Sequence, residues 1–139
     1  MKALVQRVSR AAVRIEGEVI ASIGPGLLVL LGVGHDDSPA AADALAERVR
    51  ALRIFADAGG RMNEPLGERE VLCVSQFTLY ADTRRGNRPS FVAAAPPALA
   101  AELYSRFCDR LEAARGRFGE HMEVELTNDG PVTILLEVT

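Results

Sequence analysis

Two short segments carry the side chains most able to do chemistry. In Ser75-Gln76-Phe77-Thr78-Leu79, polar residues occupy a stretch that is otherwise typical of an apolar strand. Each polar residue there forgoes the roughly 1.5–3 kcal/mol that a buried large apolar side chain contributes. Hydroxyl and amide groups can bind a substrate carbonyl or amine. Ser75, Gln76, Phe77 and Thr78 are therefore candidate catalytic residues.

The residue types in this segment do not decide between several reactions. Thr78 could be a nucleophile, but no general base accompanies it, and an unactivated hydroxyl is a poor nucleophile. We expect a strand from Glu70 to Tyr80, on which Gln76 and Thr78 share one face. The plainer alternative is that both side chains only face solvent or hydrogen-bond a neighbour.

The second segment, Asn128-Asp129-Gly130-Pro131-Val132-Thr133, predicts a tight turn between two strands. Asp-Gly is a common hairpin turn. Pro131, however, cannot donate a hydrogen bond and disfavours helical geometry at Gly130. The Gly-Pro bond can be cis or trans, since the isomers differ by only about 0.5–1 kcal/mol. An ordinary turn and a loop presenting fixed carbonyl groups both fit this pattern.

Size and composition limit what these segments can serve. The 139 residues suit one domain, residues 1–139, and the 48% hydrophobic and 25% charged fractions are ordinary globular values. The N-terminus lacks the apolar block of a signal peptide, and the run from Gly26 to Gly34 is too short to span a bilayer. We expect a cytoplasmic protein without a membrane segment.

Nothing in the sequence calls for a metal or another cofactor. His35 and His121 are isolated from other ligand types. Cys73 and Cys108 lie in apolar stretches and are expected to be buried, reduced thiols.

The charge distribution bears on nucleic-acid binding. The net charge of −3 argues against a general polyanion-binding surface. All but one of the 16 basic residues are arginine, which suits phosphate groups. Arg84, Arg85 and Arg88 form one cluster that could meet a few phosphates, and a solvated, arginine-rich surface is the alternative.

Periodicity predicts an α+β domain with a mostly antiparallel, barrel-like sheet and two helices. One helix begins at Ser38-Pro39 and the other follows Pro96-Pro97 and runs to about Ala114. The last two strands are expected to form a hairpin around the Asn-Asp-Gly-Pro turn. Strands are expected over 4–8, 12–15, 19–23, 27–33, 70–80, 122–126 and 132–138.

Together the two segments resemble the signature pair of the bacterial D-aminoacyl-tRNA deacylases, also called D-tyrosyl-tRNA deacylases. The resemblance covers essentially the whole chain. The connections over residues 63–70 and 112–117 are shorter than in some members of the family. Further similar stretches are Gln6-Arg7-Val8, 26–33, Arg53-Ile54-Phe55 and Arg88-Pro89-Ser90-Phe91.

The resemblance implies an editing hydrolase that cleaves the ester between a D-amino acid and the terminal ribose of tRNA. It implies a homodimer with the active site at the subunit interface. Gly130 and Pro131 of one subunit, with a cis bond, would be the chiral filter in the other subunit's pocket. Residues 75–78 would line the pocket floor. Arg7 would support the turn, as would Asn128 and Thr133.

Steric exclusion of L side chains predicts one further substrate. Glycine has no side chain to exclude, so glycyl-tRNA, including glycine mischarged on alanine tRNA, should also be cleaved. Hydrolysis by water, assisted by the vicinal 2′-hydroxyl of the tRNA and by backbone N–H groups near Phe77 and Thr78, competes with the nucleophilic Thr78 mechanism.

Two other function classes compete with editing. One is a hydrolase of small-molecule esters that uses the same pocket. The other is a non-catalytic, dimeric module that binds small ligands, with the Gly-Pro turn as a dimer clasp. Selective loss of the D ester from tyrosyl-tRNA would distinguish editing from both.

Overall fold

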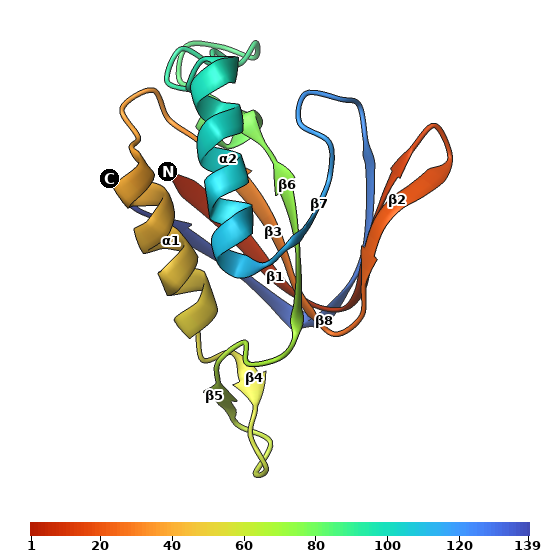
Figure 1. The fold of residues 1–139 in the computed structure, drawn as a ribbon. Helices are drawn as coiled ribbons and strands as arrows, with labels where there is room; N and C mark the ends of the chain where they lie inside the picture. Colours follow the sequence, from red (N-terminus) through yellow and green to blue (C-terminus); the bar gives the residue numbers. More distant parts are fainter.

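One long, bent strand organises the sheet of this computed structural model, which describes residues 1–139 (Figure 1). The first half of β1 (Lys2–Ile15) pairs antiparallel with β3 (Gly26–Gly32), and its second half pairs antiparallel with β2 (Glu18–Ile23). Its other edge pairs with β8 (Glu123–Glu137) over nearly its full length. β1 therefore takes part in every antiparallel strand pair of the main sheet.

The remaining strands add parallel pairs on the far side of β3. β6 (Glu70–Ser75) runs parallel to β3, and the short β7 (Ala114–Arg115) runs parallel to β6. The order is β2-β1-β3-β6-β7, and β2 also contacts β6 and β7, so the sheet curls nearly closed. The expected α+β class with a barrel-like sheet is confirmed, with a mixed pairing pattern.

Two helices lie side by side over one face of the sheet (Figure 1). α1 (Pro39–Ala51) begins as predicted, with the Ser38 hydroxyl accepting a hydrogen bond from the Ala41 N–H at 3.3 Å. α2 (Pro97–Leu111) also begins as predicted but ends before Ala114, because Glu112 takes a left-handed conformation. Neither helix combines the length and the hydrophobicity that a membrane-spanning helix needs.

Apolar side chains form two cores. The larger core lies between the sheet and the helices and contains Leu45, Leu103 and Phe107, all fully buried. The smaller one fills the curled part of the sheet, around Val13 and Leu72. Cys73 and Cys108 are buried and unbridged, as expected.

Three sequence-based expectations about the strands are wrong. The stretches 4–8 and 12–15 form one strand, β1. The strand expected over 70–80 ends at Ser75, because the chain turns into the 3₁₀ turn η1 (Phe77–Tyr80). The expected C-terminal hairpin is instead the single strand β8, whose two halves both pair with β1 because β1 is long enough to hold both.

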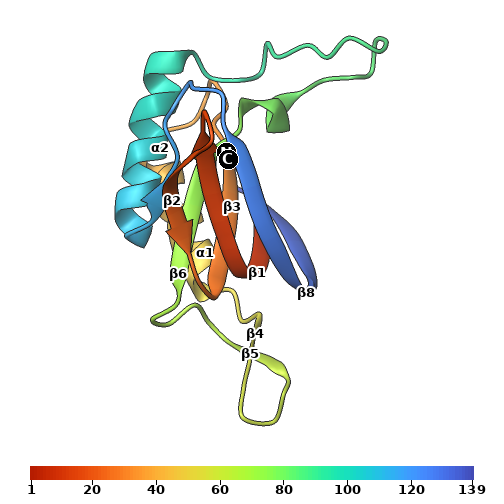
Figure 2. The ribbon, with the colours of Figure 1, turned by 90° about the vertical axis from the view of Figure 1, so that its right-hand side faces the viewer.

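Two projections mark opposite ends of the molecule (Figure 2). At one end, residues 81–96 form a long arm between η1 and α2. At the other end, β4 (Phe55–Ala56) and β5 (Met62–Glu64) form a small hairpin that pairs only with itself. Groups near one of these ends are therefore far from groups near the other end within the chain.

Candidate functional site

The 75–78 segment sits where β6 gives way to η1. The Gln76 N–H donates to the Leu31 carbonyl at 2.7 Å and closes the last rung of the sheet. The Leu79 N–H donates back to the Gln76 carbonyl at 3.2 Å as η1 begins. The first N–H groups of such a turn have no acceptor inside it. The backbone N–H groups of Phe77 and Thr78 are thus placed to donate hydrogen bonds to a ligand.

Glycines at the end of β3 allow η1 to pack closely on the sheet. A Cβ atom at Gly32 would lie 3.0 Å from the Leu79 Cβ, and one at Gly34 would lie 3.0 Å from the Tyr80 hydroxyl. The Tyr80 hydroxyl donates to the Asp37 carboxylate at 3.5 Å. Burial, and then the nearby Asp37 charge, raise the pKa of Tyr80 well above its usual value. Close contacts with the end of β3 and with Asp37 therefore hold η1 in place.

A cleft of about 610 Å³ opens beside this segment. Ser75, Gln76 and Phe77 line it, whereas Thr78 does not. Thr78 points its hydroxyl to the Gln76 amide, which donates a hydrogen bond to it. Three of the four candidate residues therefore line the cleft. The segment does not alternate as the expected strand would, because it turns into η1.

The opposite wall of the cleft was not found from the sequence. It comes from the start of α2, from the arm and from the loop before β8, and includes Phe91, Phe118 and His121. The Phe77 and Phe91 rings meet edge to face, with centroids 5.0 Å apart. Only Phe91 lay in a stretch that the sequence had singled out. Phe118 and His121 gave no signal, because a wall assembled from distant segments leaves no local pattern.

The Asn128–Thr133 segment loops out of β8 opposite a single residue of β1. In the register, Val8 pairs with Asn128 and Gln6 with Thr133, so residues 129–132 face Arg7 alone. The Asn128 side chain spans the loop, accepting from the Val132 N–H at 2.8 Å and donating to the Thr133 hydroxyl at 3.2 Å. Gln6 donates to the same hydroxyl at 3.3 Å.

Arg7 ties this loop to the body of the protein. Its Nε donates to the Asp129 carbonyl at 2.8 Å, and its Nη1 donates to the Ile54 carbonyl. The guanidinium also pairs with the Asp129 carboxylate at 3.5 Å. The Gly130–Pro131 bond is cis, and both residues are exposed. The loop is thus both anchored and accessible.

Within this chain the two segments lie at opposite ends of the sheet. Val8 pairs with Asn128 and with Gly26, which pairs with Glu70 at the start of β6. Ser75 stands five residues further along β6, about 16 Å away at roughly 3.3 Å per residue. Neither Gly130 nor Pro131 lines the cleft.

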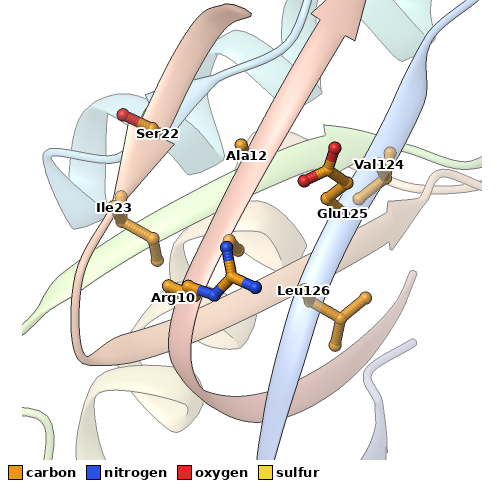
Figure 3. Close-up of a pocket in the computed structure, with 8 residues that line it drawn as sticks. Arg10, Ala12, Ser22, Ile23, Val124, Glu125 and Leu126 are labelled. Carbon is orange, nitrogen blue, oxygen red and sulfur yellow. The ribbon is translucent and has the colours of Figure 1, made fainter.

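A second hollow, of about 510 Å³, lies over β1 between β2 and β8 (Figure 3). Arg10, Ser22 and Glu125 supply its polar groups. None of the site residues expected from the sequence lines it. No group of three or more His, Cys, Asp and Glu side chains is arranged to hold a metal ion.

Comparisons with known proteins identify the family of this chain. A family model described as D-Tyr-tRNA(Tyr) deacylase matches residues 4–137. The D-aminoacyl-tRNA deacylase of Symbiobacterium thermophilum is 57% identical over 99% of this chain and 95% of its own length. That of Deinococcus deserti is 54% identical over 99% of both chains.

Solved structures give the same fold. The c-Myc DNA Unwinding Element Binding Protein superposes with a TM-score of 0.94 at 40% identity, covering 100% of this chain and 99% of that one. A probable eukaryotic D-amino acid tRNA deacylase superposes with a TM-score of 0.78 at 18% identity, covering 99% and 98%, and supports the fold alone. On the match over residues 4–137 and the full-length relatives, the chain belongs to the D-Tyr-tRNA(Tyr) deacylase family.

Proposed function

We propose that this protein hydrolyses the ester bond of D-aminoacyl-tRNA and of glycyl-tRNA, and spares L-aminoacyl-tRNA. Family membership and full-length relatives named for this reaction support the reaction class. One observation carries the proposal for how selectivity arises. The cleft and the exposed Gly130–Pro131 loop lie at opposite ends of the folded chain, so the loop does not reach the cleft of its own chain.

A homodimer would bring these two ends together. In an antiparallel arrangement of two subunits, the loop of one meets the cleft of the other, and the same contact repeats around the twofold axis. The loop suits insertion because it is exposed at its tip yet held at its base by Arg7 and Asn128. A chain held in this way loses little conformational entropy when it binds.

Selectivity then follows from shape. Carbonyl oxygens of the inserted loop, fixed beside the substrate α-carbon, leave no room for a side chain on the L side. A D side chain points away into open space, so one site accepts many D-amino acids. Because rejection needs a side chain to exclude, glycine passes as well.

For the chemical step, we place the ester carbonyl over the start of η1. The N–H groups of Phe77 and Thr78 would stabilise the oxyanion, and in other acyl-transfer enzymes one such donor contributes about 2.7–4 kcal/mol. Water would attack with help from the vicinal 2′-hydroxyl of the terminal ribose. The Ser75 and Gln76 side chains would position the substrate from the cleft wall.

The direct test is to incubate the protein with D-tyrosyl-, L-tyrosyl- and glycyl-tRNA and follow the aminoacyl ester. We expect rapid loss of the D and glycyl esters while the L ester decays at its spontaneous rate. No hydrolysis of any ester would favour a ligand-binding module. Hydrolysis of simple amino acid esters without preference for tRNA would favour a small-molecule esterase.

A further inference from the structure

Four arginines are left without a partner in a protein whose other arginines all have one. Arg10, Arg61, Arg85 and Arg88 make neither an ion pair nor a side-chain hydrogen bond. The remaining arginines bond to carboxylates or to carbonyl groups. In a chain with a net charge of −3, guanidinium groups left free are candidates for contacts with an external anion.

Two of the free guanidinium groups lie on the arm at the cleft end. Arg84, their neighbour, is neutralised by Asp82, whose carboxylate it contacts at 2.8 Å. The hydrogen bond from Arg84 lowers the pKa of Asp82 to about 2. Asp82 is therefore charged at neutral pH and the ion pair stays formed. Arg85 and Arg88 are therefore the arm's available cations.

Arg61 lies at the opposite end, on the β4–β5 hairpin, and the hairpin tip is ordered. The Asp57 carboxylate accepts from the Gly59 N–H at 2.9 Å and from the Arg61 N–H at 3.0 Å. These bonds, that of Arg61 first, lower the pKa of Asp57. The Arg61 side chain makes no ion pair with Asp57 and stays free, next in sequence to the 56% exposed Met62.

The base of the hairpin is anchored beside the Gly130–Pro131 loop. Arg7 donates both to the Asp129 carbonyl of the loop and to the Ile54 carbonyl just before β4. Arg53 donates to the Asn63 carbonyl at 2.9 Å across the hairpin. The Arg69 guanidinium stacks over the Phe55 ring at 4.3 Å. Loop and hairpin therefore project from the same end as one anchored unit (Figure 1).

We propose that the β4–β5 hairpin of one subunit contacts the RNA backbone of the acceptor end bound in its partner's cleft, through Arg61. This rests on the proposed dimer, because insertion of the loop would carry the attached hairpin to the cleft mouth. There Arg61 stands opposite the partner's arm with its free Arg85 and Arg88. RNA would run between hairpin and arm.

The chemistry of both sides suits single-stranded RNA. A guanidinium fork binds phosphate oxygens in pairs. The exposed Met62 thioether offers an adaptable apolar surface to a base or ribose. Three of the four free arginines lie at the two tips, and Arg10 lies apart from them in the hollow over β1. This placement explains how an acidic protein could bind RNA at its end. A short contact of this kind predicts a shallow salt dependence, with a slope of roughly 0.7 per phosphate.

The test compares Arg61→Gln with the wild type on D-tyrosyl-tRNA and on D-tyrosyl-adenosine, which lacks the phosphates upstream. We expect KM for the tRNA to rise roughly fivefold, as for the loss of one modest ion pair. The kcat for the tRNA should not change, and neither should kcat or KM for D-tyrosyl-adenosine. The salt slope of KM for the tRNA should fall by about 0.7.

Arg106→Gln is the matched control, because Arg106 is exposed on α2 and its partner Asp43 keeps Arg110. It removes the same charge, and we expect no change in KM. An Arg61→Gln protein that matches the wild type on tRNA overturns the proposal. So does equal weakening on both substrates, which would mean that the hairpin only supports the loop. A wild type inactive on both substrates would instead refute the proposed function.

Discussion

Arg7 connects two projections of the fold that are far apart in the sequence. Residues 129–132 face Arg7 alone across the strand pair, so its side chain is the nearest group able to fill the space beneath the loop. It reaches the loop with Nε and the approach to β4 with Nη1. Its fork geometry makes both bonds possible at once, which a lysine ammonium on a flexible stem reproduces poorly.

Thr78 illustrates a residue whose position argues against the role its chemistry suggests. Its side chain accepts a hydrogen bond from the Gln76 amide and does not line the cleft. No histidine or carboxylate hydrogen-bonds to it. Its backbone N–H, at the start of η1, is better placed for catalysis than its hydroxyl.

We therefore predict that Thr78→Ala keeps kcat within about tenfold of the wild type. The loss corresponds to one hydrogen bond of about 0.5–1.5 kcal/mol. Single-turnover hydrolysis of D-tyrosyl-tRNA measures this step. Near-complete loss of turnover with unchanged binding would show that Thr78 is the nucleophile. A tRNA ending in 2′-deoxyadenosine should, in contrast, be hydrolysed far more slowly by both proteins.

At the scale of elements, helices were easier to predict than strand ends. Ser38-Pro39 and Pro96-Pro97 mark both helix starts with local chemistry, and the structure confirms them. The end of β6 at Ser75 depends instead on Gly32 and Gly34, which allow η1 to fold against β3. Such a contact between distant segments leaves no mark in the period of residues 70–80.

The packing of α1 on α2 carries an ion-pair cluster with a defined pH dependence. Arg106 contacts the Asp43 carboxylate at 2.8 Å, and Arg110 contacts it at 3.0 Å. The hydrogen bond from Arg106 is the main cause of the lowered pKa of Asp43. Stabilisation from a lowered carboxyl pKa is present above the unfolded value of about 3.9 and is lost as the pH falls through the folded value.

Asp43→Asn should accordingly lower Tm at neutral pH, and the difference from the wild type should shrink as the pH falls below about 4. Thermal unfolding followed by circular dichroism from pH 7 to pH 2 measures it. A Tm difference that stays constant across this range would mean that packing, not charge, couples the helices at Asp43.

At the scale of the whole molecule, the resemblance predicted the family and implied that Gly130–Pro131 of one subunit acts in the pocket of another. The residue patterns alone gave no sign that residues 75–78 and Gly130–Pro131 lie apart in the fold. The registers of β1, β3, β6 and β8 put them at opposite ends. Strand register depends on long-range pairing. The sequence could suggest a dimer only through resemblance, whereas the geometry supplies a physical reason for one.

The central claim is that one subunit filters the substrate bound by the other, and subunit mixing tests it. Arg7→Lys should loosen the Gly130–Pro131 loop, so its homodimer should hydrolyse L-tyrosyl-tRNA measurably as well as the D ester. Ala94→Trp should fill the cleft that Ala94 lines and inactivate its own subunit. Two affinity tags allow heterodimers to be purified.

In a heterodimer of these two variants, the only open cleft belongs to the Arg7→Lys subunit and receives the intact loop of the Ala94→Trp subunit. The account predicts that this heterodimer regains the wild-type preference for the D ester. A double variant paired with the wild type should lose that preference, because its loosened loop serves the wild-type cleft. A first heterodimer that cleaves L-tyrosyl-tRNA as readily as the Arg7→Lys homodimer would contradict filtering across the interface.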